Sequence, residues 1–175
     1  RHRAREAART GLHLSTVVDD LVAPAYPRSR AELADSVVYG LQELGNALET
    51  MLARELASIV GWEKPAPREK DGIICSPDGD SSRSGTIDEV KMTWQQFDPD
   101  TFFQSPKGFN YLTRIQGYCH VWGYQRARLH ALFARGRRRG SPLPLPVSVV
   151  MRFSDDDLRA NWSVILQHAR DKGML

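Results

Sequence analysis

The sequence predicts an α/β or α+β fold with a central mixed β-sheet flanked by helices. Apolar residues recur every three or four positions in a long stretch from residue 29, which is typical of a helix. Four shorter runs between residues 73 and 153 are rich in β-branched and apolar residues. The predicted order is therefore helix, helix, strand, strand, helix, strand, strand, helix, which is typical of a mixed sheet covered by helices.

The first two predicted elements are helices. Residues 13–22 (HLSTVVDDLV) predict a short helix, with Ser15 or Thr16 as its N-cap. A long helix is expected to begin near Ser29 and to follow a stripe of leucines. Gly45 interrupts this stripe at a cost of roughly 1 kcal/mol relative to alanine. We therefore expect another backbone to approach closely there.

The rest of the chain alternates between extended and helical patterns. Two of the extended runs, on either side of the connection SSRSG, are expected to pair as a hairpin. The C-terminal helix has Ser154 as its cap, acidic residues in its first turn and Gly173 as its stop. In chain order the elements are a loop at 61–72, a short strand running into a turn at 73–80, a strand at 86–94, a loop at 97–109, a helix at 111–124, strands at 126–134 and 147–153, and a helix at 154–173.

Length and composition are those of one soluble domain. The chain has 175 residues, of which 41% are hydrophobic and 26% charged. We expect residues 1–28 to form a helical N-terminal arm and residues 29–175 to form the core. No run approaches the ~20 apolar residues of a membrane span, and the basic N-terminus lacks the apolar centre of a signal peptide. A cytoplasmic protein with no membrane partner is expected.

The number of cysteines and the positions of the arginines indicate which kinds of site the protein can have. Cys75 and Cys119 are too few for a disulfide framework or a four-cysteine metal cluster. The net charge is only +3, but arginines gather in one loop that could contact phosphates. Loops of this kind are about equally common as solvated surface. The loop arginines are Arg135, Arg137, Arg138 and Arg139.

Asp78, Glu89 and Lys91 form the candidate site. Asp78 lies in SPDG, at the end of the first hairpin strand, while the alternation of the second strand places Glu89 and Lys91 on one face and Asp88 on the other. Phosphodiester hydrolysis needs neutralised phosphate charge and an activated water, and Mg²⁺ or Mn²⁺ held by carboxylates supplies both. A nearby ammonium adds electrostatic stabilisation. Separately these features are weak, because Glu-x-Lys is usually an exposed pair worth under ~1 kcal/mol and Asp-Gly is a common turn.

This pattern, Asp78 followed by Glu89-Val90-Lys91, resembles the PD-(D/E)XK nuclease superfamily. Upstream, GNALE resembles the G-x-x-x-E element of its RecB-like and lambda-exonuclease-like branches, which adds Glu49 as an acid. The resemblance covers roughly residues 29–134.

A further likeness to those branches lies downstream, where YLTRIQGY resembles the helix that carries a glutamine and a tyrosine. Gln116 is the glutamine, with Tyr111 and Tyr118 as neighbours. The chain departs from the usual Q-x-x-x-Y pattern, because His120 stands four residues after Gln116 and Tyr118 only two after it.

The resemblance implies a restriction-endonuclease-like core and a single nuclease domain over residues 1–175. It implies a Mg²⁺- or Mn²⁺-dependent deoxyribonuclease, with exonuclease action favoured, in DNA processing, recombination or repair and often phage-encoded. No iron-sulfur cluster is expected, since relatives that carry one have four cysteines. A catalytically inactive nucleic-acid-binding or interaction module of the same fold is the alternative, and the oligomeric state, a homo-oligomeric ring or a monomer, stays open. The implied roles are catalysis by Asp78, Glu89, Lys91 and Gln116, metal binding by Glu49, Asp78, Glu89 and the carbonyl of Val90, and DNA contact by Tyr111, Tyr118, Arg135, Arg137, Arg138 and Arg139.

Overall fold

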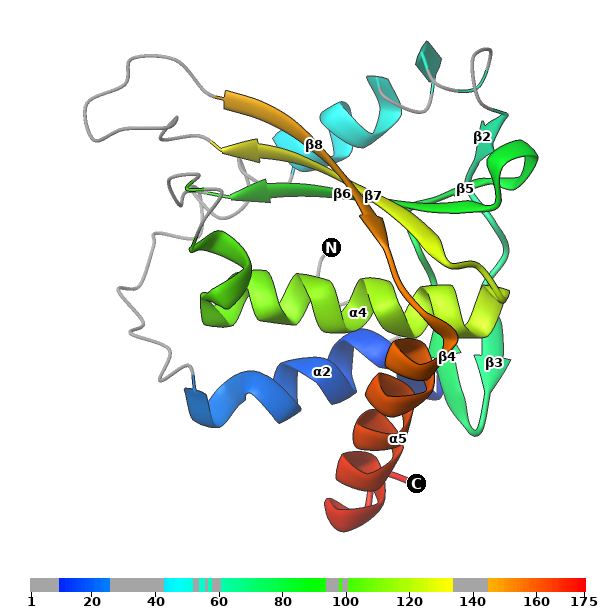
Figure 1. The fold of residues 1–175 in the computed structure, drawn as a ribbon, viewed down its shortest axis with the longest axis vertical. Coiled ribbons are helices and arrows are strands. Elements are labelled where there is room, and N and C mark those ends of the chain that lie inside the picture. The colour runs from blue at the N-terminus through cyan, green and yellow to red at the C-terminus, as the bar shows by residue number, and fades with distance from the viewer. Residues whose placement is uncertain are drawn as a thin grey trace.

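A five-stranded mixed sheet and a smaller three-stranded sheet form the framework of the protein (Figure 1). The predicted α+β class with a central mixed sheet is confirmed, and the second sheet was not predicted. The structure is a computed structural model, and it describes residues 10–25, 43–51, 54, 55, 57, 61–93, 98, 101–133 and 145–175.

The larger sheet has the order β2-β5-β6-β7-β8. β6 and β7 run parallel, and the chain crosses between them through a helix, because parallel neighbours need a long connection. The other neighbours are antiparallel. The bounds are β2 Trp62–Glu63, β5 Gly79–Ser81, β6 Thr86–Thr93, β7 Arg126–Phe133 and β8 Leu145–Arg152.

The smaller sheet consists of β1 (Leu12–His13), β4 (Ile73–Cys75) and β3 (Arg68–Lys70), in the order β1-β4-β3. β3 and β4 form a hairpin through Asp71 and Gly72, which have φ values of 52° and 79°. Asp-Gly suits this turn, since both central residues need positive φ and glycine adopts it without steric cost.

Two sequence predictions are therefore wrong in this region. Residues 61–72, expected as a loop, contain β2 and β3. The strand of the run 73–80, expected to lead into a turn and to pair with 86–94 as a hairpin, is β4, which belongs to the smaller sheet, and β5 follows it in the larger sheet. Only β5 forms the predicted hairpin with β6, with Gly79 opposite Asp88.

Three described helices, α2 (Leu14–Val22), α4 (Pro106–Trp122) and α5 (Asp155–Asp171), lie on one side of the larger sheet (Figure 1). α4 lies between the sheet and α2, and its Ile115 is fully buried. A Cβ at Gly117 would meet Leu14 Cδ2 of α2 at 2.8 Å and Ile165 Cδ1 of α5 at 3.7 Å. The missing side chain at Gly117 thus lets the three helices pack closely. No helix in the described ranges is long and apolar enough to cross a membrane.

The helix ends correct some predicted boundaries. α2 begins after His13 as N-cap, not after Ser15 or Thr16. α4 begins at Pro106 rather than near residue 111, because the Ser105 hydroxyl accepts a hydrogen bond from the Gly108 N–H at 3.1 Å. At α5 the structure confirms the Ser154 cap, which also exchanges hydrogen bonds with Asp157.

The long predicted helix from Ser29 is described only in part. Residues 43–51, 54, 55 and 57 are helical, and its predicted start lies outside the described residues. Within the described part of the chain, a Cβ at Gly45 would meet no atom within 4 Å. The close backbone approach expected there is therefore absent among these residues.

Candidate active site

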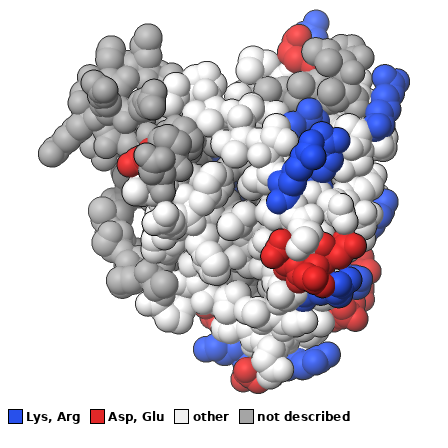
Figure 2. Space-filling model, in the orientation of Figure 1, with Lys and Arg blue, Asp and Glu red and all other residues white. Residues whose placement is uncertain are grey.

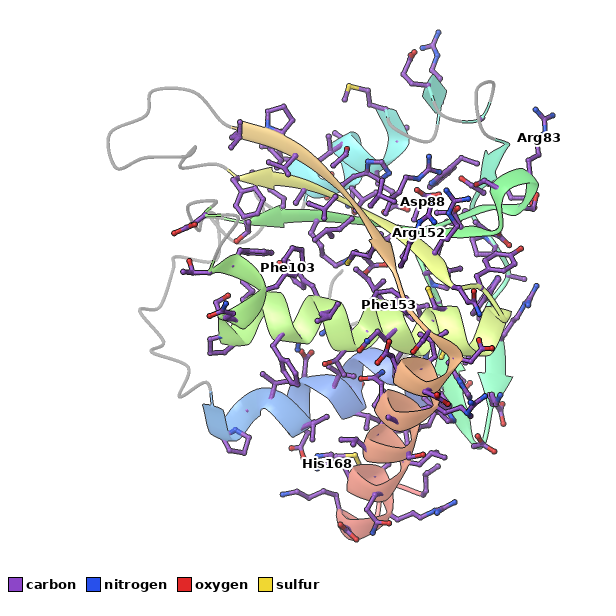
Figure 3. All side chains as sticks on the ribbon, in the orientation of Figure 1. Arg83, Asp88, Phe103, Arg152, Phe153 and His168 are labelled. Atoms are coloured by element: carbon purple, nitrogen blue, oxygen red, sulfur yellow. The ribbon has the colours of Figure 1, made fainter. Side chains whose placement is uncertain are left out.

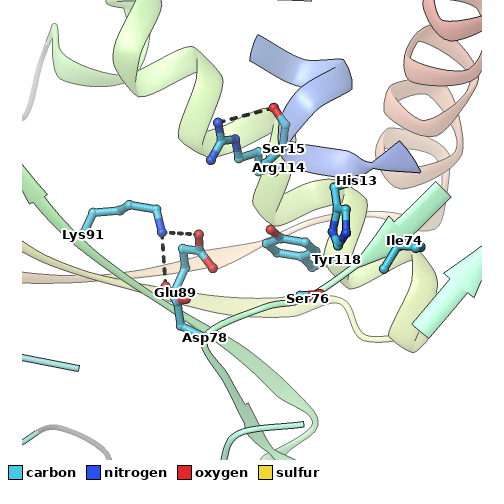
Figure 4. Close-up of a pocket in the computed structure, with 9 residues that line it drawn as sticks. All are labelled: His13, Ser15, Ile74, Ser76, Asp78, Glu89, Lys91, Arg114 and Tyr118. Carbon is cyan, nitrogen blue, oxygen red and sulfur yellow. Dashed lines mark hydrogen bonds and ion pairs between the residues drawn. The ribbon is translucent and has the colours of Figure 1, made fainter. Parts of the chain in front are cut away.

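A polar cavity of about 180 Å³ opens where the two sheets meet α2 and α4 (Figure 4). Asp78, Glu89 and Lys91 all line it, so the structure brings the central predicted residues together. The full set of lining residues is His13, Ser15, Ile74, Ser76, Asp78, Glu89, Lys91, Arg114 and Tyr118.

The β5–β6 register explains why the two carboxylates are neighbours. Gly79 pairs with Asp88, so continuing the register by one residue places Asp78 beside Glu89. β5 has ended at that point, which leaves the N–H of Val90 free to donate to Asp78 Oδ2 at 2.9 Å. Asp78 is therefore held against β6 by a backbone hydrogen bond.

Lys91 lies between the two acids. Its Nζ forms an ion pair with Glu89 Oε1 and contacts Asp78 Oδ2 at 3.1 Å. It also donates to the carbonyl of Val90 at 3.0 Å. The side chain of Glu89 is only 3% exposed, and its Oε2 is buried without a hydrogen-bond partner among the described residues. One carboxylate oxygen thus remains available inside the cavity.

Burial and charge set the protonation of the site. Burial, with the nearby charge of Asp78, raises the pKa of Glu89 to about 7, although Lys91 acts against the rise. Burial disfavours the ammonium of Lys91, but the carboxylates of Glu89 and Asp78 outweigh it and raise the Lys91 pKa well above its ordinary value. Burial and then Glu89 raise the pKa of Tyr118, so its phenol stays protonated. At neutral pH the site therefore holds a cationic lysine and an acid close to its midpoint.

The oxygen atoms around Lys91 suit a hard divalent cation. Oxygens of Asp78 and Glu89 and the carbonyl of Val90 converge on one positive charge, and Glu89 Oε2 has a free lone pair in the same place. Mg²⁺ and Mn²⁺ prefer such oxygen donors. In the described ranges there is no group of three or more His, Cys, Asp or Glu side chains suited to a metal. The donors present are thus two carboxylates and one backbone carbonyl.

Two predicted site residues are not brought to this cavity. Glu49 forms an ion pair with Lys64 and is not among the lining residues. Gln116 also does not line the cavity. At 100° per residue it lies on the side of α4 opposite to Arg114 and Tyr118, each two positions away.

Of the residues predicted to contact DNA, only one is found in the cavity among the described residues. Tyr118 lines the cavity, whereas Tyr111 is buried and packs near the ring of Phe102, with centroids 6.2 Å apart. The predicted arginine cluster, Arg135, Arg137, Arg138 and Arg139, lies outside the described residues.

Arg114 is the main cavity residue that the sequence analysis missed. It contacts the carboxylate of Asp19 and the carbonyl of Ser15, and its buried Nε has no hydrogen-bond partner among the described residues. The sequence contained a pattern that points to Arg114. In Q-x-x-x-Y the first residue stands four positions before the tyrosine, and four positions before Tyr118 is Arg114, not Gln116. His13, Ser15 and Ser76 were also missed as cavity residues.

The opposite face of β6 carries a separate polar network, as the alternation predicted. Asp88 is fully buried there (Figure 3) and accepts hydrogen bonds from Ser81 Oγ at 2.6 Å and from Arg128 Nε at 2.7 Å. His130 Nε2 lies 3.1 Å from Asp88, and its Nδ1 lies 2.8 Å from Ser148 Oγ. The network links four neighbouring strands of the larger sheet.

Comparison with solved structures shows which fold this is. A protein called SSO0001 matches with a TM-score of 0.64 and 14% identity, over 98% of this chain and 81% of that one. An alkaline exonuclease from Laribacter hongkongensis matches with a TM-score of 0.53 and 18% identity, over 95% and 91%. A phage-related exonuclease from Haemophilus somnus 129PT matches with a TM-score of 0.52 and 15% identity, over 88% and 79%.

No family model and no curated protein sequence matches this chain. The structural likeness, at such low identity, concerns the fold. The chain therefore shares the fold of a solved phage-related exonuclease and a solved alkaline exonuclease, in agreement with the fold that the sequence resemblance implied.

Proposed function

We propose that this protein is a divalent-metal-dependent DNA nuclease that acts as an exonuclease. The observation that carries the proposal is the convergence of Asp78, Glu89 and the Val90 carbonyl on the ammonium of Lys91 inside one cavity. The names of two solved structures with this fold, an alkaline and a phage-related exonuclease, support the same activity. A role in DNA processing, recombination or repair is proposed with it.

In this proposal Asp78, Glu89 and the carbonyl of Val90 hold Mg²⁺ or Mn²⁺. Such a cation neutralises charge on the scissile phosphate and makes a bound water more acidic. The N–H of Val90 keeps Asp78 oriented, since it donates to the oxygen of Asp78 that also faces Lys91. Lys91, which stays next to both acids, orients the attacking water.

Arg114 and Tyr118 are proposed to contact the DNA phosphate from the opposite wall of the cavity (Figure 4). The Nε of Arg114 is a donor without a hydrogen-bond partner among the described residues, and guanidinium groups bind phosphate oxygens well. The phenol of Tyr118 stays protonated, because burial raises its pKa, and can donate a hydrogen bond. The arginines Arg135, Arg137, Arg138 and Arg139 are proposed as further contacts with the DNA backbone.

The test is cleavage of a linear duplex and of a closed circular plasmid, with Mg²⁺, Mn²⁺ or EDTA. Glu89→Gln and Lys91→Ala should each lower the rate by about 100-fold or more, as expected when one electrostatic group is removed from a site. Glu69→Gln and Lys70→Ala, matched exposed changes on β3, should leave it nearly unchanged. Full activity in either site variant overturns the assignment, and rapid cleavage of the closed plasmid overturns the exonuclease mode.

A calorimetric Mn²⁺ titration separates this proposal from the inactive alternative. The folded protein should bind Mn²⁺, and Glu89→Gln should weaken binding because it removes a carboxylate ligand. Absence of binding by the folded wild-type protein favours a DNA-binding or interaction module that retains the fold without catalysis.

A further inference from the structure

A second cavity, of about 370 Å³, lies where β7 begins and β8 ends. It combines positive charge, aromatic surface and glycine backbone. Figure 2 shows Lys and Arg side chains gathered there, next to the acidic first turn of α5, and Figure 3 places Arg152 and Phe153 at this end of β8. The lining residues are Gly85, Gly123, Tyr124, Gln125, Arg126, Arg152 and Phe153.

The positive charge comes from two arginines that face each other across the β7–β8 ladder. Arg126 is paired in register with Arg152, and both are exposed. Like charges directly opposite each other destabilise a sheet. Arg128, two residues further along β7, is neutralised by Asp88, but in the described part of the chain neither Arg126 nor Arg152 has an ion-pair partner. The pair therefore offers two guanidinium groups to an anion.

The aromatic walls are held in place by other contacts. Burial and then the nearby carboxylate of Asp80 raise the pKa of Tyr124, and the N–H of Phe153 donates to the carbonyl of Gln125 at 3.0 Å. The side chain of Gln125 in turn donates to Asp155 at 2.9 Å. Both rings are half-buried, so part of each ring remains accessible.

We propose that this cavity binds a nucleotide unit of the DNA strand, with its phosphate between Arg126 and Arg152 and its base against Tyr124 or Phe153. Paired guanidinium groups suit a phosphate, and aromatic rings stack on bases of any sequence. The inference rests on the proposed function for the identity of the strand, and it adds a binding site outside the catalytic cavity.

The two sites hold different nucleotides. Arg126 and Arg152 lie on the Asp88 face of the sheet, whereas Glu89 and Lys91 lie on the other. Leu129 pairs with Glu89, so Arg126 is three residues, or about 10 Å, away along the strand.

The test is the fluorescence anisotropy of labelled dT₁₀ in EDTA over a range of salt concentrations. The double variant Arg126→Ala/Arg152→Ala should bind about tenfold more weakly, and its plot of log affinity against log salt should be shallower by about 0.7, because one phosphate contact is lost. The matched control Arg159→Ala/Lys172→Ala removes the same charge from exposed positions on and after α5 and should keep the wild-type slope. Equal slopes for the two double variants overturn the proposal.

A second variant tests the base contact. Tyr124→Leu should weaken dT₁₀ binding several-fold and leave the binding of inorganic polyphosphate unchanged. An unchanged dT₁₀ affinity in both Tyr124→Leu and Phe153→Leu overturns the base contact and reduces the site to one for phosphate alone. Because EDTA prevents cleavage, loss of affinity in the arginine double variant upholds this site even if the wild-type protein cleaves no DNA with Mg²⁺ or Mn²⁺.

Discussion

Replacing Asp88 by asparagine should destabilise the sheet that carries Glu89 and Lys91 of the candidate site. The carboxylate of Asp88 is fully buried and accepts hydrogen bonds from Ser81, Arg128 and His130. Asparagine keeps the size of the side chain but removes the charge, and its amide NH₂ faces groups that themselves donate. The guanidinium of Arg128, only 19% exposed, then loses its counter-ion.

The size of the effect follows from these contacts. Removing one partner of a buried ion pair costs roughly 3–5 kcal/mol, because the other charge stays buried. Asparagine still offers one carbonyl acceptor, so we expect the lower end, a loss of about 3 kcal/mol in the free energy of unfolding. A domain stable by about 5–15 kcal/mol remains folded after such a loss.

The pH dependence gives a second measure of the same interaction. Burial alone would raise the pKa of Asp88, but hydrogen bonds from His130, Arg128 and Ser81 outweigh burial and lower it. A carboxyl group with a lowered pKa stabilises the folded state above its unfolded pKa of about 4. That stabilisation is lost as the pH falls through the folded pKa. The difference between the wild type and Asp88→Asn should therefore shrink below about pH 4.

Urea denaturation at pH 7 and at pH 3, followed by tryptophan fluorescence, measures both effects. Asp171→Asn, an exposed position at the end of α5, serves as the control and should leave the free energy of unfolding nearly unchanged. A loss below about 1 kcal/mol in Asp88→Asn at pH 7 would refute the reasoning, since a buried charge pair would then be worth no more than a surface one.

Three further predictions concern the cavity, the strand next to the sheet edge and a helical glycine. Because burial and the charge of Asp78 raise the pKa of Glu89 to about 7, and ligands bind metals deprotonated, Mn²⁺ affinity should increase about tenfold between pH 6 and pH 8. Calorimetry measures this, and a pH-independent affinity contradicts the role of Glu89. In Gly79→Ala, the new Cβ would meet Trp62 Nε1 at 2.0 Å, so the free energy of unfolding should fall by about 1–3 kcal/mol. Gly45→Ala, in helix and open among the described residues, should raise it by up to about 1 kcal/mol, and thermal denaturation distinguishes the two outcomes.

Elements determined by local rules were predictable from the sequence. β6 and β7 follow from eight-residue runs with strand-forming residues and partial alternation, and α5 follows from the cap at Ser154 and the stop at Gly173. The short strands β2 and β3 were not predictable, because two or three residues carry no period and their pairing partners are distant in sequence. The division between β4 and β5 likewise depends on the second sheet.

The candidate site shows the same limit. Alternation alone places Glu89 and Lys91 on one face, and the turn at Asp78 brings the second acid to them. Arg114 was not predicted because Gln116 was taken as the first residue of the Q-x-x-x-Y pattern. Arg114 and Tyr118 are four residues apart and therefore share one face of α4. The contributions of α2 to the cavity arise from long-range packing, which no local pattern reveals.

The contrast between Asp88 and Glu89 favours a working metal site over an inactive remnant. Both are buried acids on one strand, yet the pKa of Asp88 is lowered and that of Glu89 is raised to about 7. Asp88 is saturated with donors on its own face, whereas Glu89 has an oxygen without a hydrogen-bond partner among the described residues. A structural acid is stabilised by the donors around it, and an unpaired buried oxygen costs free energy unless something else binds it. Since Glu89 shares its cavity with Asp78, a divalent cation held as proposed would remove this cost.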